Sequence, residues 1–311
     1  MISQTKKINL IHSIIFFFMI GTILIFASQG SVLKIPSIIC LFLILTIGIS
    51  HGSLDHIKGK KILKILKVKK IYIFYLAYTL IALSVIGIWL VQPLLVLLLF
   101  LTISSYHFGK EDAYFLVDKK SKLNELIYFL KGLLIIVSPL LFHFEETINI
   151  FNVLLIKNEK FFIFLNYLEG SKSLYVILFL SISANFYIFL KRFKIMNFLL
   201  LFDFLSILIL NYCLTPLIAF TIYFCFLHSV RHTISLIKEL DSKNFKNGLF
   251  KFLEKATPLT LFTGIMYISC LLYLNNFFEL DDAILKVIFI GLASLTFPHI
   301  LLEYAIKKNG K

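Results

Sequence analysis

The sequence is poor in the residues on which soluble and secreted proteins depend. Only 15% of the 311 residues are Asp, Glu, Lys or Arg, whereas 59% are hydrophobic and the mean hydropathy is +0.92. A soluble globular domain carries about 25% charged residues, so that class is excluded. The four cysteines all lie within or at the edge of apolar segments, and they form neither a disulfide framework nor a CxxC metal motif.

Long apolar runs fill most of the chain instead. A membrane-spanning helix needs about 20 mostly apolar residues, and ten segments approach or meet that requirement. They cover about 8–28, 35–51, 71–92, 93–108, 124–144, 172–190, 196–213, 216–236, 258–275 and 283–305. The sequence therefore predicts an all-α, polytopic transmembrane helix bundle. We expect residues 1–311 to form a single integral-membrane catalytic domain in the cell (inner) membrane, with an interfacial helix within 145–171.

Acidic residues are also scarce, with 17 Asp and Glu against 31 Lys and Arg and a net charge of +14. The basic residues lie between the apolar runs, where they would face anionic lipid headgroups, so the charge does not indicate nucleic-acid binding. With ten spans, 24 Lys and Arg fall on one side of the membrane and 4 on the other. Because cytoplasmic connections carry the excess of Lys and Arg, both termini are predicted to be cytoplasmic.

Five of the eight histidines gather near the cytoplasmic ends of even-numbered segments. They are His51, His107, His228, His232 and His299. Each comes a few residues before the next group of cytoplasmic lysines, so all five are predicted to lie at similar depth. Ionisable residues inside a membrane are costly and point to function.

The spacing of His228 and His232 favours a metal site. Residues i and i+4 share one face of a helix, about 6 Å apart, which suits two ligands of one ion. His51 and His107 supply two further ligands from other helices. Four neutral imidazoles suit Fe(II), Zn or Cu and leave coordination positions open. The sequence alone does not distinguish His299 from these four candidate ligands. Two other roles, lining a substrate cavity and packing between helices, fit His299 equally well.

Acidic residues follow two of the predicted ligands. Asp55 lies close to His51, and Glu111 and Asp112 lie close to His107. Metal-bound histidines usually donate their second N–H to a carboxylate or carbonyl group, so these residues are predicted to support the ligands, with Arg231 pairing with one of them.

Other features of these segments are expected to serve packing. Gly52 and Gly109 each follow a predicted ligand and would permit close helix contact or a helix end. His12 and His143 are expected to form hydrogen bonds between helices, and His56 is expected at the membrane edge.

At these residues the sequence resembles the Brp/Blh family of bacterial and archaeal membrane β-carotene 15,15′-dioxygenases. The resemblance rests on HGSLDH at 51–56, HFGKED at 107–112, Gly132 to His143, YFCFLHSVRH at 223–232 and PHILLE at 298–303. The combination of HG-x-x-D, HFG-x-x-D and HS-x-RH is specific, although each motif alone is weak. One departure is Phe144, where the family pattern has proline.

The resemblance implies oxidative cleavage of the central double bond of β-carotene by O2 to two molecules of retinal, with Fe(2+) as cofactor. It places the iron ligands at His51, His107, His228 and His232. It further implies a functional link to a retinylidene rhodopsin. A carotenoid dissolved in the lipid bilayer would reach such a site from the side, through apolar and aromatic surroundings.

Three other functions compete with this interpretation. A membrane di-iron desaturase or hydroxylase needs about eight ligands in HxxxH and HxxHH clusters, and here only His228 and His232 have such spacing. A b-type haem carrier needs histidine pairs on facing helices but no i, i+4 pair. A metal-ion transporter would place its histidines at several depths.

Overall fold

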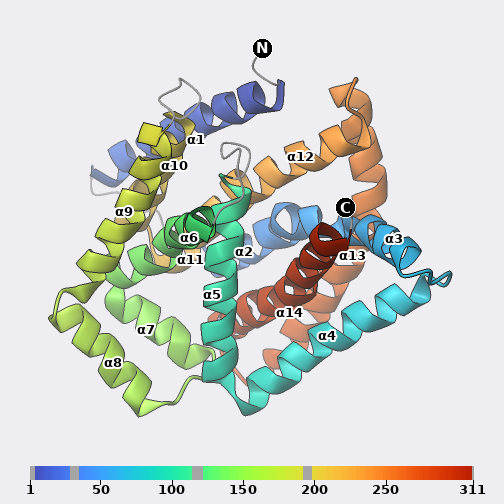
Figure 1. Ribbon diagram of the computed structural model, residues 1–311. Coiled ribbons are helices and arrows are strands. Elements are labelled where there is room, and N and C mark those ends of the chain that lie inside the picture. The colour runs from blue at the N-terminus through green and yellow to red at the C-terminus, as the bar shows by residue number, and fades with distance from the viewer. Residues whose placement is uncertain (1–3, 29–34, 114–121, 192–197, 310–311) are drawn as a thin grey trace. The chain divides into compact units, whose positions relative to one another are not determined.

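Helices form all the regular secondary structure of the described residues 4–28, 35–113, 122–191 and 198–309 in this computed structural model (Figure 1). The α-helices are α1 (Gln4–Ser28), α2 (Ser37–Leu43), α3 (Asp55–Ile65), α4 (Tyr72–Val91), α5 (Pro93–Glu111), α6 (Lys122–Phe142), α7 (Phe144–Val153), α8 (Glu159–Gly170), α9 (Ser173–Lys191), α10 (Phe198–Cys213), α11 (Pro216–Ile222), α12 (Val230–Leu240), α13 (Phe245–Leu274) and α14 (Leu280–Asn309). The all-α prediction is confirmed for these residues.

Within the described residues, each of the ten predicted segments lies mainly in helical structure. Within the described ranges, eight helical stretches are long and apolar enough to cross a membrane. The pair α8 and α9, bent by 73°, makes a ninth if it is one span, and α10 is a shorter apolar helix of 16 residues. The segment 145–171 contains most of α7 and all of α8, so its helical character is confirmed.

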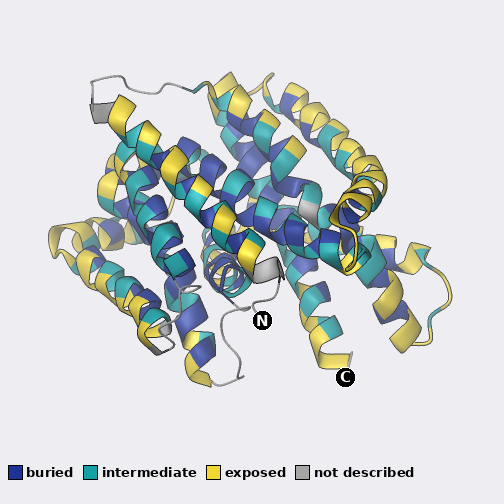
Figure 2. Cartoon of the chain, turned by 90° about the horizontal axis from the view of Figure 1, so that it is seen from above, coloured by how far each residue is buried: buried dark blue, intermediate teal, exposed yellow. Residues whose placement is uncertain are grey.

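Large apolar side chains are exposed along several helices, as expected for surfaces that contact lipid rather than water. Figure 2 shows exposed residues along the faces of helices whose other faces are buried. On α13, for example, Leu261, Phe262, Ile265 and Met266 are all more than half exposed. Soluble monomers rarely present contiguous apolar surface of this extent. The exposed faces, together with the long apolar helices, indicate a membrane protein.

The chain divides into two units, each described here by itself. The first consists of Met1–Cys40, Leu101–Asn152 and Lys157–Ser235. Within it, α1 packs along α10, and α6 packs along both α9 and α10 (Figure 1). Apolar residues of α6, α9 and α10 form one core cluster with Ala113, which lies two residues beyond the end of α5. This unit contains His107, His228 and His232.

The second unit consists of Leu41–Phe100, Val153–Ile156 and Leu236–Lys311. Within it, α14 packs against α3, α4 and α13. Ile62, Leu63, Phe74 and Leu302 form a buried cluster that joins α3, α4 and α14. Trp89, fully buried on α4, donates a hydrogen bond from Nε1 to the carbonyl of Leu154 at 3.0 Å.

Two helices depart from α geometry at the motifs that carry predicted ligands. After α2 the chain forms a π-helical turn, η1 (Ile44–Gly48), and then a 3-10 helix, η2 (Ile49–Leu54), which contains His51. Between α11 and α12 it forms a second π-helical turn, η5 (Tyr223–Ser229), which contains His228. Single π-turns inside helices occur frequently at functional sites because they redirect side chains.

Candidate metal centre

His107 and His228 bring two buried imidazoles together in the first unit. His107 lies near the end of α5 and His228 lies in η5, and their ring centroids are 5.4 Å apart at an interplanar angle of 68°. Aromatic rings surround His228, with the centroid of Phe108 at 4.7 Å and that of Phe224 stacked at 5.9 Å. This environment removes water from the imidazoles, although they are groups that need polar partners.

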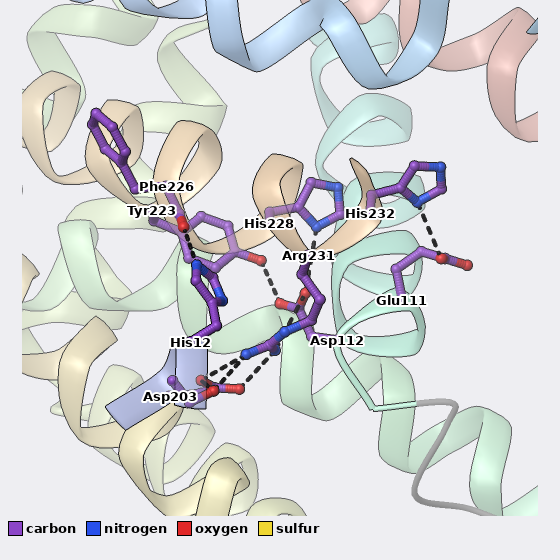
Figure 3. Close-up of polar contacts among 10 residues, drawn as sticks. His12, Glu111, Asp112, Asp203, Tyr223, Phe226, His228, Arg231 and His232 are labelled. Carbon is purple, nitrogen blue, oxygen red and sulfur yellow. Dashed lines mark hydrogen bonds and ion pairs between the residues drawn. The ribbon is translucent and has the colours of Figure 1, made fainter. Parts of the chain in front are cut away.

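Asp112 faces His228 across the end of α5. Its Oδ1 lies 3.5 Å from Nδ1 of His228, and its Oδ2 accepts a hydrogen bond of 2.8 Å from the hydroxyl of Tyr223 (Figure 3). All three side chains are buried. A carboxylate on Nδ1 turns the imidazole so that Nε2 points the other way, as in many metal-binding histidines.

His232, the next predicted ligand, has the same kind of neighbour. It is buried on α12, and its Nδ1 lies 3.4 Å from Oε2 of Glu111, at the last turn of α5 (Figure 3). The consecutive acids Glu111 and Asp112 thus face the two histidines of the HS-x-RH motif. The sequence analysis singled out both acids, but through their proximity to His107 in the chain.

The structure gives Arg231 a different principal partner from those predicted. Its guanidinium donates to both carboxylate oxygens of Asp203, at 2.7 and 3.0 Å, and to Oγ of Ser13 at 2.7 Å. Arg231 also pairs with Asp112, one of the predicted acids, whose Oδ1 lies 3.8 Å from Nη1, as the sequence analysis expected. The sequence analysis missed Asp203, although a lone carboxylate in the apolar run LLLFDFLSILIL is itself a signal of function.

Gly109 and Gly132 account for the close contact of α5 and α6 beside His107. A Cβ on Gly109 would lie 1.9 Å from the carbonyl oxygen of Tyr128, and one on Gly132 would lie 1.8 Å from the carbonyl oxygen of Ser105. Only glycine permits this approach. The expectation of close packing at Gly109 is therefore confirmed. A Cβ on Gly52, by contrast, would meet nothing within 4 Å in the part of the chain that the structure describes, so no close contact of this kind is seen there.

In the second unit, Asp55 pairs with His299. Oδ2 of Asp55 lies 2.8 Å from Nδ1 of His299 and accepts a hydrogen bond of 3.0 Å from the hydroxyl of Tyr78. Oε1 of Glu303 lies 3.8 Å from Nε2 of His299 and pairs with Lys58 at 2.8 Å. His299 thus belongs to a buried polar network with carboxylates near both of its nitrogens, rather than to apolar packing.

The other four histidines are His12, His51, His56 and His143. The backbone of His51 lies in η2, but its side chain lies outside the described residues. His12 donates a hydrogen bond from Nε2 to the carbonyl of Phe226, at 2.8 Å, which joins α1 to η5 as expected. His143 has Nδ1 3.7 Å from Glu146 in the following turn, and Nδ1 of half-buried His56 contacts the carbonyl of Ser53 at 2.9 Å.

Comparison with known proteins identifies the family of this chain. A sequence profile described as "Beta-carotene 15,15'-dioxygenase" matches residues 42–307, which is most of the chain. The chain belongs to this family. A relative named "Beta-carotene 15,15'-dioxygenase", from the uncultured marine bacterium 66A03, is 28% identical over 267 residues, which cover 84% of this chain and 90% of the relative. No solved structure matches the chain significantly.

The region matched to the β-carotene 15,15′-dioxygenase family includes all four predicted ligands and His299, whereas His12 lies outside it. Within the first unit, His107, His228 and His232 offer neutral nitrogen donors, and acids at two Nδ1 atoms add negative charge. That donor set fits a divalent transition metal such as Fe(II) and is poorly suited to Mg²⁺ or Ca²⁺, which prefer oxygen.

Proposed function

We propose that this protein is a membrane-embedded dioxygenase that cleaves the central 15,15′ double bond of β-carotene with O2 and releases two molecules of retinal. Family membership supports the substrate and the reaction class. The single observation that carries the proposal in the structure is the pairing of buried His107 and His228, 5.4 Å apart, with Asp112 at Nδ1 of His228. A buried imidazole pair backed by a carboxylate is the arrangement expected of metal ligands.

In this proposal His51, His107, His228 and His232 hold one non-haem Fe(II). Support comes from the donor chemistry and from the acids that face Nδ1 of His228 and His232 at 3.5 and 3.4 Å, which favour Nε2 as the coordinating atom. Iron(II) would supply the activation of O2. The protein needs no nucleophilic side chain, because its task is to place the double bond beside the metal.

The surroundings of His228 suit a hydrocarbon substrate. Phe108, Tyr223 and Phe224 pack around the imidazole and exclude water from it. A polyene offers few polar groups for recognition, so regioselectivity would come from the length of the apolar surface on either side of the iron. Asp112 and Glu111 would keep the imidazoles oriented while the substrate enters and leaves.

The proposal includes the membrane arrangement predicted from sequence. Ten spans with cytoplasmic termini, in the cell (inner) membrane, account for the 24 to 4 distribution of Lys and Arg. We treat the whole chain as one catalytic domain. β-Carotene would enter from the bilayer, and the retinal that leaves would be available to a retinylidene rhodopsin, the functional link implied by the family resemblance.

Expression in cells that accumulate β-carotene tests the activity directly. The wild-type chain should bleach the orange cells, and chromatography of their lipid extract should show retinal in place of β-carotene. Cells expressing His228→Ala at the same membrane level should stay orange. If the wild-type chain is inserted in the membrane and leaves β-carotene intact, the proposed substrate is wrong.

A further inference from the structure

A buried ionic network lies beside the proposed ligands in the first unit. Arg231 is the residue before His232 and three residues after His228, and its guanidinium is buried. Asp203 on α10 and Ser13 on α1 are buried with it. Neither residue is part of the motifs that indicate the family.

Short hydrogen bonds join Arg231, Asp203 and Ser13. Nη1 and Nη2 of Arg231 donate to Oδ2 and Oδ1 of Asp203 at 2.7 and 3.0 Å (Figure 3). The hydroxyl of Ser13 donates to Oδ1 of Asp203 at 2.8 Å and accepts from Nη2 of Arg231 at 2.7 Å. A bidentate ion pair of this kind fixes the plane of the guanidinium as well as its position. It therefore ties the segment that carries His228 and His232 to α10 and α1.

The network reaches the ligands through Asp112. Oδ1 of Asp112 lies 3.8 Å from Nη1 of Arg231 and 3.5 Å from Nδ1 of His228. The chain of contacts runs from Asp203 through Arg231 and Asp112 to an imidazole. A change at Asp203 can therefore alter His228 without touching it.

Charge in the network is balanced. The network holds two buried basic residues, Arg231 and Lys131, and two buried acidic residues, Asp112 and Asp203, and both acids interact electrostatically with both basic residues. Buried charges are costly unless they are compensated. Loss of the Asp203 charge would leave an excess positive charge near a bound cation, and electrostatic repulsion would then weaken metal binding.

We propose that Asp203 is a positioning residue, which acts through Arg231 and Asp112 to orient the proposed iron ligands His228 and His232 and to balance the charge beside them. This inference rests on the proposed function, since it assumes that these histidines bind Fe(II). It assigns Asp203 no contact with iron or with substrate. Its consequence is an effect on metal affinity and ligand geometry.

Metal titration of the purified full-length protein tests the role of Asp203. Wild type, Asp203→Asn, Asp203→Glu, Ser13→Ala and Ser206→Ala would be titrated anaerobically with Fe(II), and with Co(II), whose visible absorption bands report ligand geometry. Ser206→Ala is the matched control, because Ser206 is buried on the same helix and its hydroxyl makes no hydrogen bond to the described residues of the network.

We expect Asp203→Asn to weaken Fe(II) binding by about 10–100-fold and to shift the Co(II) bands, as for other residues that support metal ligands. Asp203→Glu, which keeps the charge, should recover part of the affinity, and Ser13→Ala should weaken binding by a smaller factor. Ser206→Ala should match wild type in both readouts.

The possible outcomes separate this inference from the proposed function. If wild type binds no Fe(II), both are overturned. If wild type binds Fe(II) and folded Asp203→Asn matches it in affinity and spectrum, only the role of Asp203 is overturned, even if that variant unfolds at lower temperature. If Asp203→Asn does not fold, Ser13→Ala and Asp203→Glu decide, and wild-type binding by both overturns the inference.

Discussion

Gly109 and Gly132 bring the backbones of α5 and α6 into direct contact, two residues along α5 from His107. A Cβ placed on Gly109 would lie 2.7 Å from the amide nitrogen of Gly132, and one on Gly132 would lie 2.9 Å from the amide nitrogen of Gly109. Real Cβ atoms essentially never approach other atoms so closely, so any side chain at either position must push the helices apart. The position of His107 therefore depends on two residues without side chains.

Substitution of either glycine should separate α5 from α6. Gly109→Ala and Gly132→Ala should each lower stability by about 3 kcal/mol or more, since overpacking is costly and the obstructing atoms belong to backbone. They should also reduce retinal formation, because His107 would move. Thermal unfolding in detergent and turnover in membranes measure the two effects. Gly87→Ala on α4, where a Cβ would meet nothing within 4 Å, is the control; equal stability of all three variants would contradict the prediction.

Removal of a proposed ligand should abolish catalysis without preventing membrane insertion. Ala at position 51, 107, 228 or 232 would remove one of four imidazoles, and retinal formation should fall below detection while the protein remains in the membrane fraction. His143→Gln provides a histidine control, because His143 is not a proposed ligand and its Nδ1 lies 3.7 Å from Glu146 in the following turn. Substantial turnover by His228→Ala would remove that residue from the ligand set.

The acids that face Nδ1 should affect metal affinity more modestly. Asp112→Asn and Glu111→Gln should each weaken Fe(II) binding by about 10–100-fold, because a neutral amide orients and polarises the imidazole less well than a carboxylate. Asp112→Asn should have the larger effect, since Asp112 is buried and also accepts from Tyr223, whereas Glu111 is half-buried. Equilibrium titration with Fe(II) gives the affinities. Unchanged binding in both variants would contradict a supporting role for either acid.

Asp55 provides a contrast to these acids because its partner is His299. Asp55→Asn should weaken Fe(II) binding, because η2, which carries His51, immediately precedes Asp55 and its network with His299. We expect a loss of up to about 10-fold, at the lower end of the range for residues that support ligands. Tyr78→Phe removes the second hydrogen bond to Asp55 and should show a smaller effect in the same direction. A larger loss in Tyr78→Phe than in Asp55→Asn would contradict this order.

The positions of the helices could be predicted because hydrophobic runs of membrane length leave little alternative to helix. All backbone groups must be satisfied within the segment when no water is present. The π-turn at Tyr223–Ser229 and the 3-10 turn at Ile49–Leu54 could not be predicted in this way. The π-turn takes part in a tertiary contact, the hydrogen bond from His12 to the carbonyl of Phe226, which local composition does not reveal.

The sequence alone did not indicate that Asp112 would face His228. Asp112 follows His107 by five residues, which corresponds to about 140° around a helix, so the two side chains point in different directions. The structure directs Asp112 to His228, a residue 116 positions later in the chain. Asp203 was missed for a related reason, since its partners Arg231 and Ser13 lie on other helices. Only the cost of burying an isolated carboxylate indicates such a residue from sequence.

The iron content distinguishes the proposed dioxygenase from its closest competitor. We expect about one iron per polypeptide, whereas a di-iron oxidase would bind two. Elemental analysis of purified protein gives the ratio, and protein from Fe-depleted cells, reconstituted with Fe(II), is the control for loss during purification. An absorbance scan of the same sample tests for haem. A ratio near two, or a strong Soret band, would contradict a single non-haem site.

Asp241 should make the connection between α12 and α13 sensitive to strong acid. Its Oδ1 accepts from the backbone N–H groups of Lys243 and Asn244, and its Oδ2 accepts from Asn247 and Lys251. The hydrogen bond from the N–H of Asn244, followed by those from Lys251 and Asn247, holds the pKa of Asp241 well below its ordinary range. Asn244 in turn caps α13, so the carboxylate supports the start of that helix.

The sign of the pH dependence follows from this lowered pKa. The carboxylate contributes its full stabilisation above the pKa of an unfolded Asp, about 3.9, and the contribution disappears as the pH falls through the lower pKa of the folded state. Asp241→Asn should therefore reduce hydrogen-exchange protection of the Lys243 and Asn244 amides at neutral pH, and its difference from wild type should shrink only below about pH 4. Glu254→Gln, an exposed substitution on α13, should leave those amides unchanged. A difference that grows as the pH falls would show that Asp241 does not act through its charge.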